Sequence, residues 1–422
     1  MRRMKSSSIK GCVLLTLAVA ANHSQAAPTE IKVDTAFAAY GEMHRAIAAT
    51  FMQAHPDIKV VFNAPASSYD ELFQRTIRGA ITGSIADVSF QSYNFVRPLV
   101  DRGVPLALDS LVAGEANWAD LGYLPNITRM ANVGGKVYGL PFNTSIPFIY
   151  YNKTQVRESG SSPDAFPRSW DDIASLAKSI SDHAGPGTGI YVDYYYIVAN
   201  LTFDALIETR GGRMMSDDLK EVAFDDPEGI SALETLHKLG ASGMIDATRD
   251  QAQQSFKAGA MGIYVGTSSD ISALKSAADA AGWQLGCAAF PLSNGGRYPA
   301  GGNAGMITTK DPAKQRAAWQ YIKFATGEIG QSIVAKYSGY MPSNSKTIEN
   351  PSFRSTFDAH PCYKIAVDQL PHVTQPFTFP GPNAQRISDA IRERLRDVVS
   401  QKRKPSQVMP EMVSDVKALL PK

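Results

Sequence analysis

Short β-type runs alternate with amphipathic helical stretches along nearly the whole chain, and this order constrains the fold more than any other feature. Residues 31–35, 58–62 and 87–90 are rich in β-branched and apolar side chains and predict strands. Between them, residues 44–54 and 69–81 carry apolar side chains at helical spacing. This order predicts a mainly parallel sheet with helices on both faces, and such sheets bind ligands beyond the carboxyl ends of their strands.

The middle and the end of the chain have the same organisation. Residues 148–152 and 261–265 predict strands, and residues 170–180, 227–239 and 387–399 predict helices. No low-complexity linker separates the parts. We therefore expect an α/β fold of two lobes, with the chain passing between the lobes more than once.

Residues 1–26 differ from everything that follows. They hold four basic residues and no acid, then a short apolar run at 13–21, then small residues up to Ala26. This pattern predicts an export signal cleaved after Ala26, and the run is too short for a membrane span of about 20 residues. The whole chain has 42 basic and 40 acidic residues; without the four it has 38 against 40, a net charge of −2. A periplasmic protein without a nucleic-acid partner fits this balance.

No pattern for covalent catalysis or metal binding stands out. The nucleophile elbow G-x-S-x-G and the zinc pair H-E-x-x-H are both absent, and Gly134-Gly135-Lys136 lacks the Ser or Thr of a phosphate loop. We therefore expect no catalytic residue, no metal and no cofactor. Beyond residue 26 only Cys287 and Cys362 remain, and the sequence fits one disulfide or two buried thiols about equally.

Four segments in order resemble the periplasmic or extracellular solute-binding proteins of ABC importers, nearest the branch that binds sn-glycerol 3-phosphate. They are 141–153 (PFNTSIPFIYYNK), 169–172 (SWDD), 256–264 (FKAGAMGIY) and 339–344 (GYMPSN). The resemblance implies the two-lobed periplasmic-binding-protein fold, each lobe a mainly parallel sheet flanked by helices, with the ligand cleft between them. The expected division is 1–26 signal peptide, 27–141 plus 268–328 lobe 1, and 142–267 plus 329–422 lobe 2.

The resemblance also implies a set of ligand contacts. The matched positions are Tyr69, Ser92, Ser145, Tyr194, Thr267, Gly302, Tyr340 and Arg386. Arg386 matters most, because a guanidinium can hold phosphate or sulfonate oxygens with two parallel hydrogen bonds. Ser92 stands where the glycerol-phosphate binder has a glutamate, so we expect a ligand that differs at its hydroxyl end.

A purely structural role would also explain several of these residues. Tyr69 fits a hydrophobic staple at a helix start, and Thr267 a capping turn. Gly302 lies in a glycine-rich stretch that we predict to be a loop, where it fits a plain turn as well as a close approach to ligand. Arg386 fits a solvated helix start.

The expected function is capture of a small polar, anionic polyol by cleft closure and its delivery to the permease subunits of an ABC importer. Glycerol 3-phosphate, a glycerophosphodiester, or a sulfo- or phospho-sugar would fit, and a monomer that is not embedded in the membrane is expected. One alternative is a neutral sugar or oligosaccharide binder of the same importer class. Others are a ligand-sensing partner of a membrane receptor, and an exported hydrolase acting on a phosphorylated or glycosylated substrate.

Overall fold

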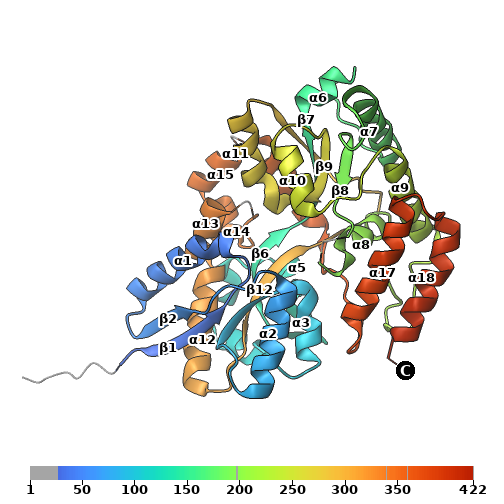
Figure 1. The fold of residues 1–422 in the computed structure, drawn as a ribbon. Helices are drawn as coiled ribbons and strands as arrows, with labels where there is room; N and C mark the ends of the chain where they lie inside the picture. The colour runs from blue at the N-terminus through green and yellow to red at the C-terminus, as the bar shows by residue number, and fades with distance from the viewer. Residues whose placement is uncertain (1–26, 196–197, 339, 359, 422) are drawn as a thin grey trace, which may run out of the picture.

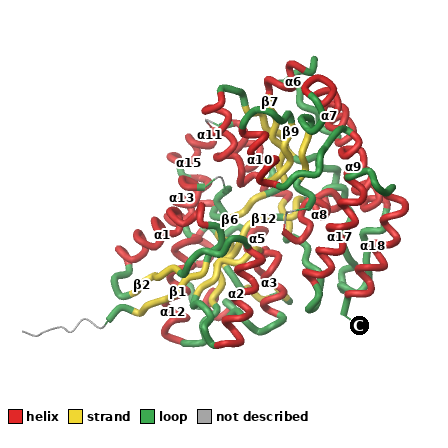
Figure 2. The backbone as a smooth tube through the Cα atoms, viewed as in Figure 1, coloured by secondary structure: helices red, strands yellow, loops and turns green. Residues whose placement is uncertain are grey.

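The computed structural model describes residues 27–195, 198–338, 340–358 and 360–421 (Figure 1). The expected signal peptide therefore lies outside the described residues, as do Tyr196 and Gly339. In the described part of the chain, two groups of strands form separate central sheets, each with helices packed around it (Figures 1 and 2). No helix in these ranges is long and apolar enough to cross a membrane.

The first sheet has five strands in the order β2-β1-β3-β12-β6. Their bounds are β1 (Thr29–Asp34), β2 (Ile58–Phe62), β3 (Val88–Ser92), β6 (Leu140–Ser145) and β12 (Gly301–Ile307). The helices around this sheet are α1 (Gly41–Ala54), α2 (Tyr69–Thr82), α3 (Tyr93–Val100), α4 (Asp109–Ala113), α5 (Pro125–Thr128), α12 (Pro312–Thr326) and α13 (Glu328–Tyr337). β1 is parallel to β2 and β3, whereas β12 is antiparallel to β3 and β6.

The second sheet has four strands in the order β10-β7-β9-β8. Their bounds are β7 (Pro147–Asn152), β8 (Ile190–Val192), β9 (Ile263–Thr267) and β10 (Leu285–Ala289). Its helices are α6 (Lys153–Glu158), α7 (Trp170–Ala184), α8 (Leu201–Glu208), α9 (Pro227–Ala241), α10 (Arg249–Lys257), α11 (Ile271–Ala281), α16 (Pro361–Asp368), α17 (Ala384–Val399) and α18 (Pro405–Leu419). β7 is antiparallel to β9 and β10, and β8 is parallel to β9.

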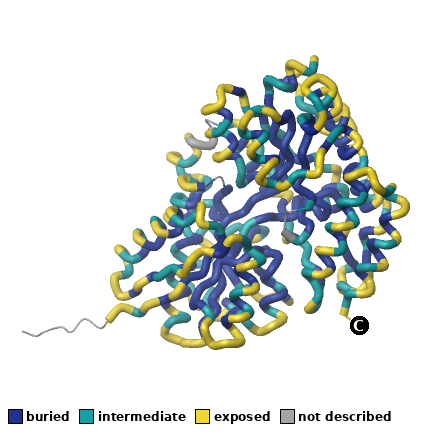
Figure 3. Tube along the Cα trace, viewed as in Figure 1, coloured by how far each residue is buried: buried dark blue, intermediate teal, exposed yellow. Residues whose placement is uncertain are grey.

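In each sheet all strands but one run in the same direction, so the mainly parallel architecture is confirmed. The exceptions are β12 in the first sheet and β7 in the second. β3, β6, β7, β8 and β9 are buried along their whole length because helices cover both faces of the sheets, as the dark tubes of Figure 3 show. This arrangement confirms the expected α/β fold of two lobes.

The chain crosses between the sheets over very short connections. β6 ends at Ser145 and β7 begins at Pro147, so only the buried Ile146 separates a strand of one sheet from a strand of the other. The expected division differs from the structure at several elements. α11 and β10, placed by sequence in lobe 1, belong to the second sheet, where β10 pairs with β7. The end of β6 and α13, placed in lobe 2, belong to the first sheet and its helices. These misplacements arise because no linker marks the crossings.

The glycine-rich stretch at 301–305, which we predicted to be a loop, is the start of strand β12. β12 lies between β3 and β6, so its residues face neighbours on both edges. A Cβ on Gly305 would come within 3.1 Å of the Phe90 ring and 3.2 Å of Ile322. Glycine therefore lets this strand pack closely where a larger side chain would be crowded.

A disulfide joins Cys287 to Cys362, with the two Cα atoms 5.4 Å apart. It ties β10, an edge strand of the second sheet, to helix α16. The helix pair α14 (Ser345–Glu349) and α15 (Pro351–Asp358) connects the two lobes on this side, because α14 contacts α13 and α15 contacts α16. The sequence had left open whether the two cysteines pair.

Candidate ligand-binding cleft

A cavity of about 400 Å³ lies where the two sheets meet. Its lining residues are Phe37, Ala39, Tyr40, Ser68, Tyr69, Asp70, Ser145, Leu201, Arg249, Asp250, Gln253, Thr267, Ser269, Asp270, Gly301, Gly302 and Tyr340. β6 ends at Ser145 and β9 ends at Thr267, so the cavity lies beyond the carboxyl ends of a strand from each sheet. This is the position in which α/β sheets bind ligands.

The cavity brings together five of the eight residues expected to contact ligand. They are Tyr69, Ser145, Thr267, Gly302 and Tyr340. Helix α2 positions the first of them: Ser68 is its N-cap and accepts a hydrogen bond from the Glu71 backbone N–H at 3.1 Å. The Tyr69 hydroxyl then accepts a hydrogen bond from Asn303 Nδ2 at 2.7 Å, which fixes the phenol toward β12.

Aromatic rings form one wall of the cavity. Phe37 meets Tyr69 edge to face with ring centroids 5.0 Å apart, and Tyr40 meets Tyr340 at 5.6 Å. Burial raises the pKa of Tyr69 above its usual value, so this phenol stays protonated at neutral pH and can donate or accept. Such a wall presents flat apolar faces with hydroxyl groups at their edges.

Arg249 is the cation of the cavity, and the resemblance did not indicate it. It is the first residue of α10, where the helix dipole disfavours a positive charge. Its Nε lies 3.3 Å from Asp193 Oδ2, and its Nη2 lies 3.5 Å from Asp270 Oδ2. Burial alone would lower the pKa of Arg249, but the carboxylates of Asp270 and Asp193 raise it well above its usual value. The guanidinium is therefore charged, and the carboxylates of Asp193 and Asp270 both neutralise it.

The charge of the cavity is negative. Arg249 is the one cation among the described residues that line it, against the carboxylates of Asp70, Asp250 and Asp270. Asp193, fully buried behind Arg249, adds another carboxylate. The sequence predicted no helix here, and the signal that could have indicated the cluster is the capping pair Thr248 and Gln251, which places Arg249 at the first position of α10. The helix dipole disfavours a cation there, and nearby acids offset this cost.

Three expected contacts lie outside the cavity. Ser92 is buried at the end of β3, where its Oγ donates to Asn94 Oδ1 at 3.3 Å. Tyr194 is buried in the core of the second lobe. Arg386 is exposed, and its Nη1 lies 3.4 Å from Asn383 Oδ1. The apolar residues of α17 explain the exposure, because Ile387, Ile391 and Leu395 turn toward the core and Arg386 lies off that stripe.

Gly302 has a backbone reason to be glycine besides its place in the cavity. Its φ angle is 122°, and an added Cβ would overlap the Asn143 carbonyl oxygen and lie 3.0 Å from the Tyr93 ring. Both the angle and the contact exclude other residues. The glycine therefore allows β12 to pass close to β6 at the rim of the cavity.

Replacing Gly302 by alanine should lower the free energy of unfolding by about 3 kcal/mol, because a strained φ and a steric overlap add. Gly295→Ala is the matched control: its φ is 82°, but nothing lies within 4 Å of the added Cβ. We expect the control to cost about 1 kcal/mol, the strain alone. Urea unfolding measures both, and equal losses would show that the Asn143 contact carries no weight.

Two α/β lobes with a polar cavity where their strands end define a two-lobed solute-binding protein. A model of the bacterial extracellular solute-binding protein family matches residues 46–359, and the chain therefore belongs to this family. It is an ABC extracellular solute-binding protein. The family implies a small-molecule ligand, permease partners and a location outside the cytoplasmic membrane.

Curated relatives align over nearly their whole length at low identity. A binding protein of Brucella abortus is 21% identical, covering 100% of this chain and 99% of the relative. The sn-glycerol-3-phosphate-binding periplasmic protein UgpB of Yersinia enterocolitica is 21% identical, covering 97% of this chain and 96% of the relative. The resemblance to the glycerol-phosphate branch is confirmed at this level.

Solved structures share the fold. UgpB from Mycobacterium tuberculosis in complex with glycerophosphocholine has a TM-score of 0.80 at 20% identity, covering 93% of this chain and 98% of that one. A solute-binding protein from Thermotoga lettingae bound with alpha-D-tagatose has a TM-score of 0.78 at 19% identity, covering 93% and 100%. These likenesses establish the periplasmic-binding-protein fold.

Proposed function

We propose that the protein captures a neutral polyhydroxy ligand, a sugar or oligosaccharide, in the cavity between its lobes. The supporting observation is the charge of that cavity, where three carboxylates line the wall and the one cation of the described lining, Arg249, is paired with Asp193 and Asp270. An anion entering it would meet net negative charge. Carboxylates, phenols and hydroxyls instead accept the hydrogen bonds of neutral hydroxyl groups.

The aromatic wall supports the same class of ligand. Phe37, Tyr40, Tyr69 and Tyr340 lie on the side of the first lobe, and Arg249, Thr267 and Asp270 lie on the side of the second. The C–H face of a sugar ring can stack on the aromatic side while its hydroxyls bond to the polar side. Contacts from both lobes favour the closed state, which the importer's permease then recognises. We propose that the ligand is delivered unchanged, with no chemistry in the cavity.

This proposal departs from the anionic polyol that the resemblance implied. That expectation depended on Arg386, which is exposed on α17 and absent from the lining of the cavity. Without it, no unpaired guanidinium of the described residues lines the cavity to hold a phosphate. The loss of a family glutamate at Ser92 does not restore positive charge either, because Ser92 also lies outside the lining.

A second candidate is a ligand with a cationic head, such as a glycerophosphodiester of choline. Aromatic rings and carboxylates together are the groups that hold a quaternary ammonium. Both line this cavity. The structure of the M. tuberculosis UgpB with glycerophosphocholine is that of a protein with the same fold.

Thermal-shift and calorimetric titration of the mature protein test these proposals. The panel is monosaccharides, maltose-type oligosaccharides, glycerophosphocholine, glycerol 3-phosphate and a sulfonated glycoside. We expect a neutral sugar to bind, with affinity unchanged in Arg386→Ala. Binding of glycerophosphocholine alone would favour the second candidate. Binding of glycerol 3-phosphate or the sulfonated glycoside, lost in Arg386→Ala, would contradict both. Recovery of the bound compound unchanged after prolonged incubation distinguishes binding from hydrolysis.

A further inference from the structure

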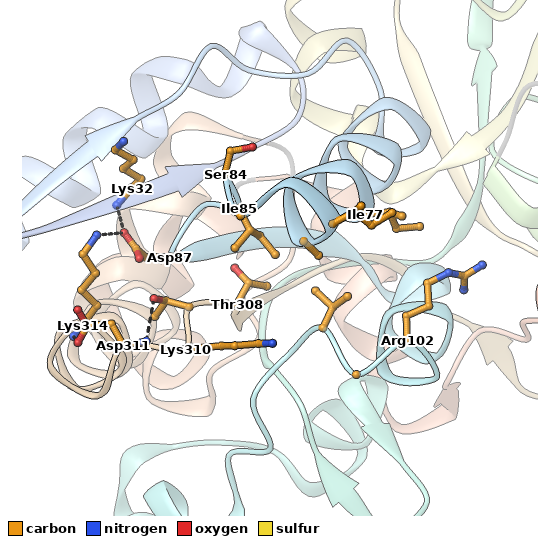
Figure 4. A pocket seen from close by; sticks show the side chains of 16 residues that line it. Lys32, Ile77, Ser84, Ile85, Asp87, Arg102, Thr308, Lys310, Asp311 and Lys314 are labelled. Carbon is orange, nitrogen blue, oxygen red and sulfur yellow. Dashed lines mark hydrogen bonds and ion pairs between the residues drawn. The ribbon is translucent and has the colours of Figure 1, made fainter.

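A second cavity, of about 880 Å³, lies at the end of the first sheet opposite the cleft. Its walls come from the end of α2, the turn after α3 and the turn that joins β12 to α12 (Figure 4). Asp87 and Thr308 lie between these walls, where the Thr308 N–H donates to the Asp87 carbonyl at 2.9 Å. The cavity is therefore at the amino ends of β1 and β3, away from the lobe interface.

Glycines form two of the turns that border this cavity. Gly83 ends α2 with a φ of 74°, and Gly103 follows α3 with a φ of 64°. An added Cβ at either position would meet nothing within 4 Å. The two turns can therefore reverse direction without placing a side chain in the space between them.

The acids of the cavity are already engaged. Asp87 accepts the Lys32 backbone N–H at 2.8 Å and pairs with Lys314 Nζ at 3.0 Å. Asp311 caps α12 by accepting the N–H groups of Ala313 at 2.8 Å and Lys314 at 3.4 Å. Both carboxylates have these partners, and the four basic residues of the lining outnumber its two acids.

Lys310 supplies the unpaired charge. Its side chain extends into the cavity beneath Thr308, and Arg102 lies at the opposite rim (Figure 4). In the described ranges no carboxylate lies within 4.0 Å of Lys310 Nζ. The mature chain is net negative by the counts above, so this is a local basic site on an acidic protein.

Apolar side chains lie next to this charge. Ile77, Ile81, Ile85 and Val104 line the cavity, and Ile81 is 80% exposed. A single exposed isoleucine is ordinary, but several in one cavity offer a surface that a ligand could remove from water. The volume is that of a small-molecule site.

We propose that this cavity binds a small amphipathic monoanion, a carboxylate with an apolar body, with the carboxylate at Lys310 and the body against Ile81 and Ile85. An amine of the same shape is disfavoured, because the Lys310 ammonium that extends into the cavity would repel it. The site is distinct from the cleft, where carboxylates dominate the lining. The two sites would then differ in charge preference, because the lining of the cleft disfavours an anion and this cavity binds one.

Displacement of a fluorescent probe tests the proposal on the mature protein. 8-Anilinonaphthalene-1-sulfonate, itself an amphipathic anion, serves as the probe, and octanoate and octylamine serve as competitors. We expect octanoate to displace the probe saturably and octylamine to leave it bound. Lys310→Glu should weaken octanoate at least about tenfold, the effect of losing one charge-assisted hydrogen bond.

Lys136→Glu makes the same charge change on an exposed lysine of the first lobe that lies outside this cavity and is the matched control. It should leave octanoate binding unchanged, and neither variant should alter titration of the cleft ligand. Circular dichroism checks folding, and Lys310→Gln replaces Lys310→Glu if the latter is misfolded. Displacement by octylamine equal to that by octanoate, or equal weakening in the Lys310 and Lys136 variants, would overturn the proposal.

Discussion

Arg249→Ala is expected to lower the free energy of unfolding by about 3 kcal/mol and to weaken binding of the cleft ligand at least about tenfold. The guanidinium lies 3.3 Å from Asp193, which is fully buried. Without Arg249, the Asp193 carboxylate loses this cation but stays buried in a medium of low dielectric constant, which is unfavourable for its charge. The same change removes the hydrogen-bond donor that Arg249 presents to the cavity.

Two further variants separate the effect of this ion pair on stability from its effect on ligand affinity. Arg249→Ala combined with Asp193→Asn should recover most of the lost stability, because no buried charge is then left without the cation, but should not recover ligand affinity. Arg386→Ala is the control, and as an exposed residue it should change stability by less than about 0.5 kcal/mol. Urea unfolding and calorimetry measure the two effects. Equal stability of Arg249→Ala and Arg386→Ala would contradict the account of this ion-pair cluster.

Removing the disulfide is expected to cost about 4 kcal/mol. The bond closes a loop with a sequence separation of 75, and the entropy of the unfolded chain rises by roughly this amount when such a loop opens. It also holds α16 on β10, which pairs with β7 on one edge. We therefore expect the Cys287→Ser, Cys362→Ser double variant to unfold at a clearly lower urea concentration than the oxidised protein.

Reduction of the unmodified protein is the matching test. With a reductant present, its unfolding midpoint should fall to that of the double variant, and the double variant should not respond to reductant. A midpoint unchanged by reduction would show that the cross-link does not contribute to stability. Ligand affinity should change little, because neither cysteine lines the cleft.

The elements that local patterns define were predicted closely. The strand at 58–62 has the predicted bounds, and the helix predicted at 69–81 runs from Tyr69 to Thr82. The helix predicted at 170–180 begins at Trp170, directly after its N-cap Ser169, which accepts the Asp172 N–H at 3.2 Å. In each case the signal is a short period or a cap, which depends on neighbours in sequence.

Predictions that depended on distant neighbours did less well. The glycine-rich segment at 301–305 has no local strand signal, and it is a strand because β3 and β6 flank it. The connection of β10 to the second sheet likewise depends on its pairing with β7. Neither contact leaves a periodic pattern in the sequence itself.

The residues of the cavity likewise fall into those that the sequence predicted and those that it did not. Tyr69, Ser145, Thr267, Gly302 and Tyr340 were matched by short motifs at strand and helix ends, and the structure brings all five to one cavity. Arg249 belongs to no motif, and its partners Asp193 and Asp270 reach it from other elements of the fold. The charge of the cavity therefore emerges only once the fold pairs its ions, and it supports the neutral ligand that we propose over the anion that the resemblance implied.

Mass spectrometry of the ligand that co-purifies with the native protein tests this charge preference most directly. The protein is isolated without denaturation, released ligand is separated from it, and both ion polarities are recorded. We expect a neutral sugar or oligosaccharide, detected as a cation adduct and free of phosphorus and sulfur. A phosphorylated or sulfonated compound, bound in equimolar amount and lost from the Arg386→Ala protein, would contradict it.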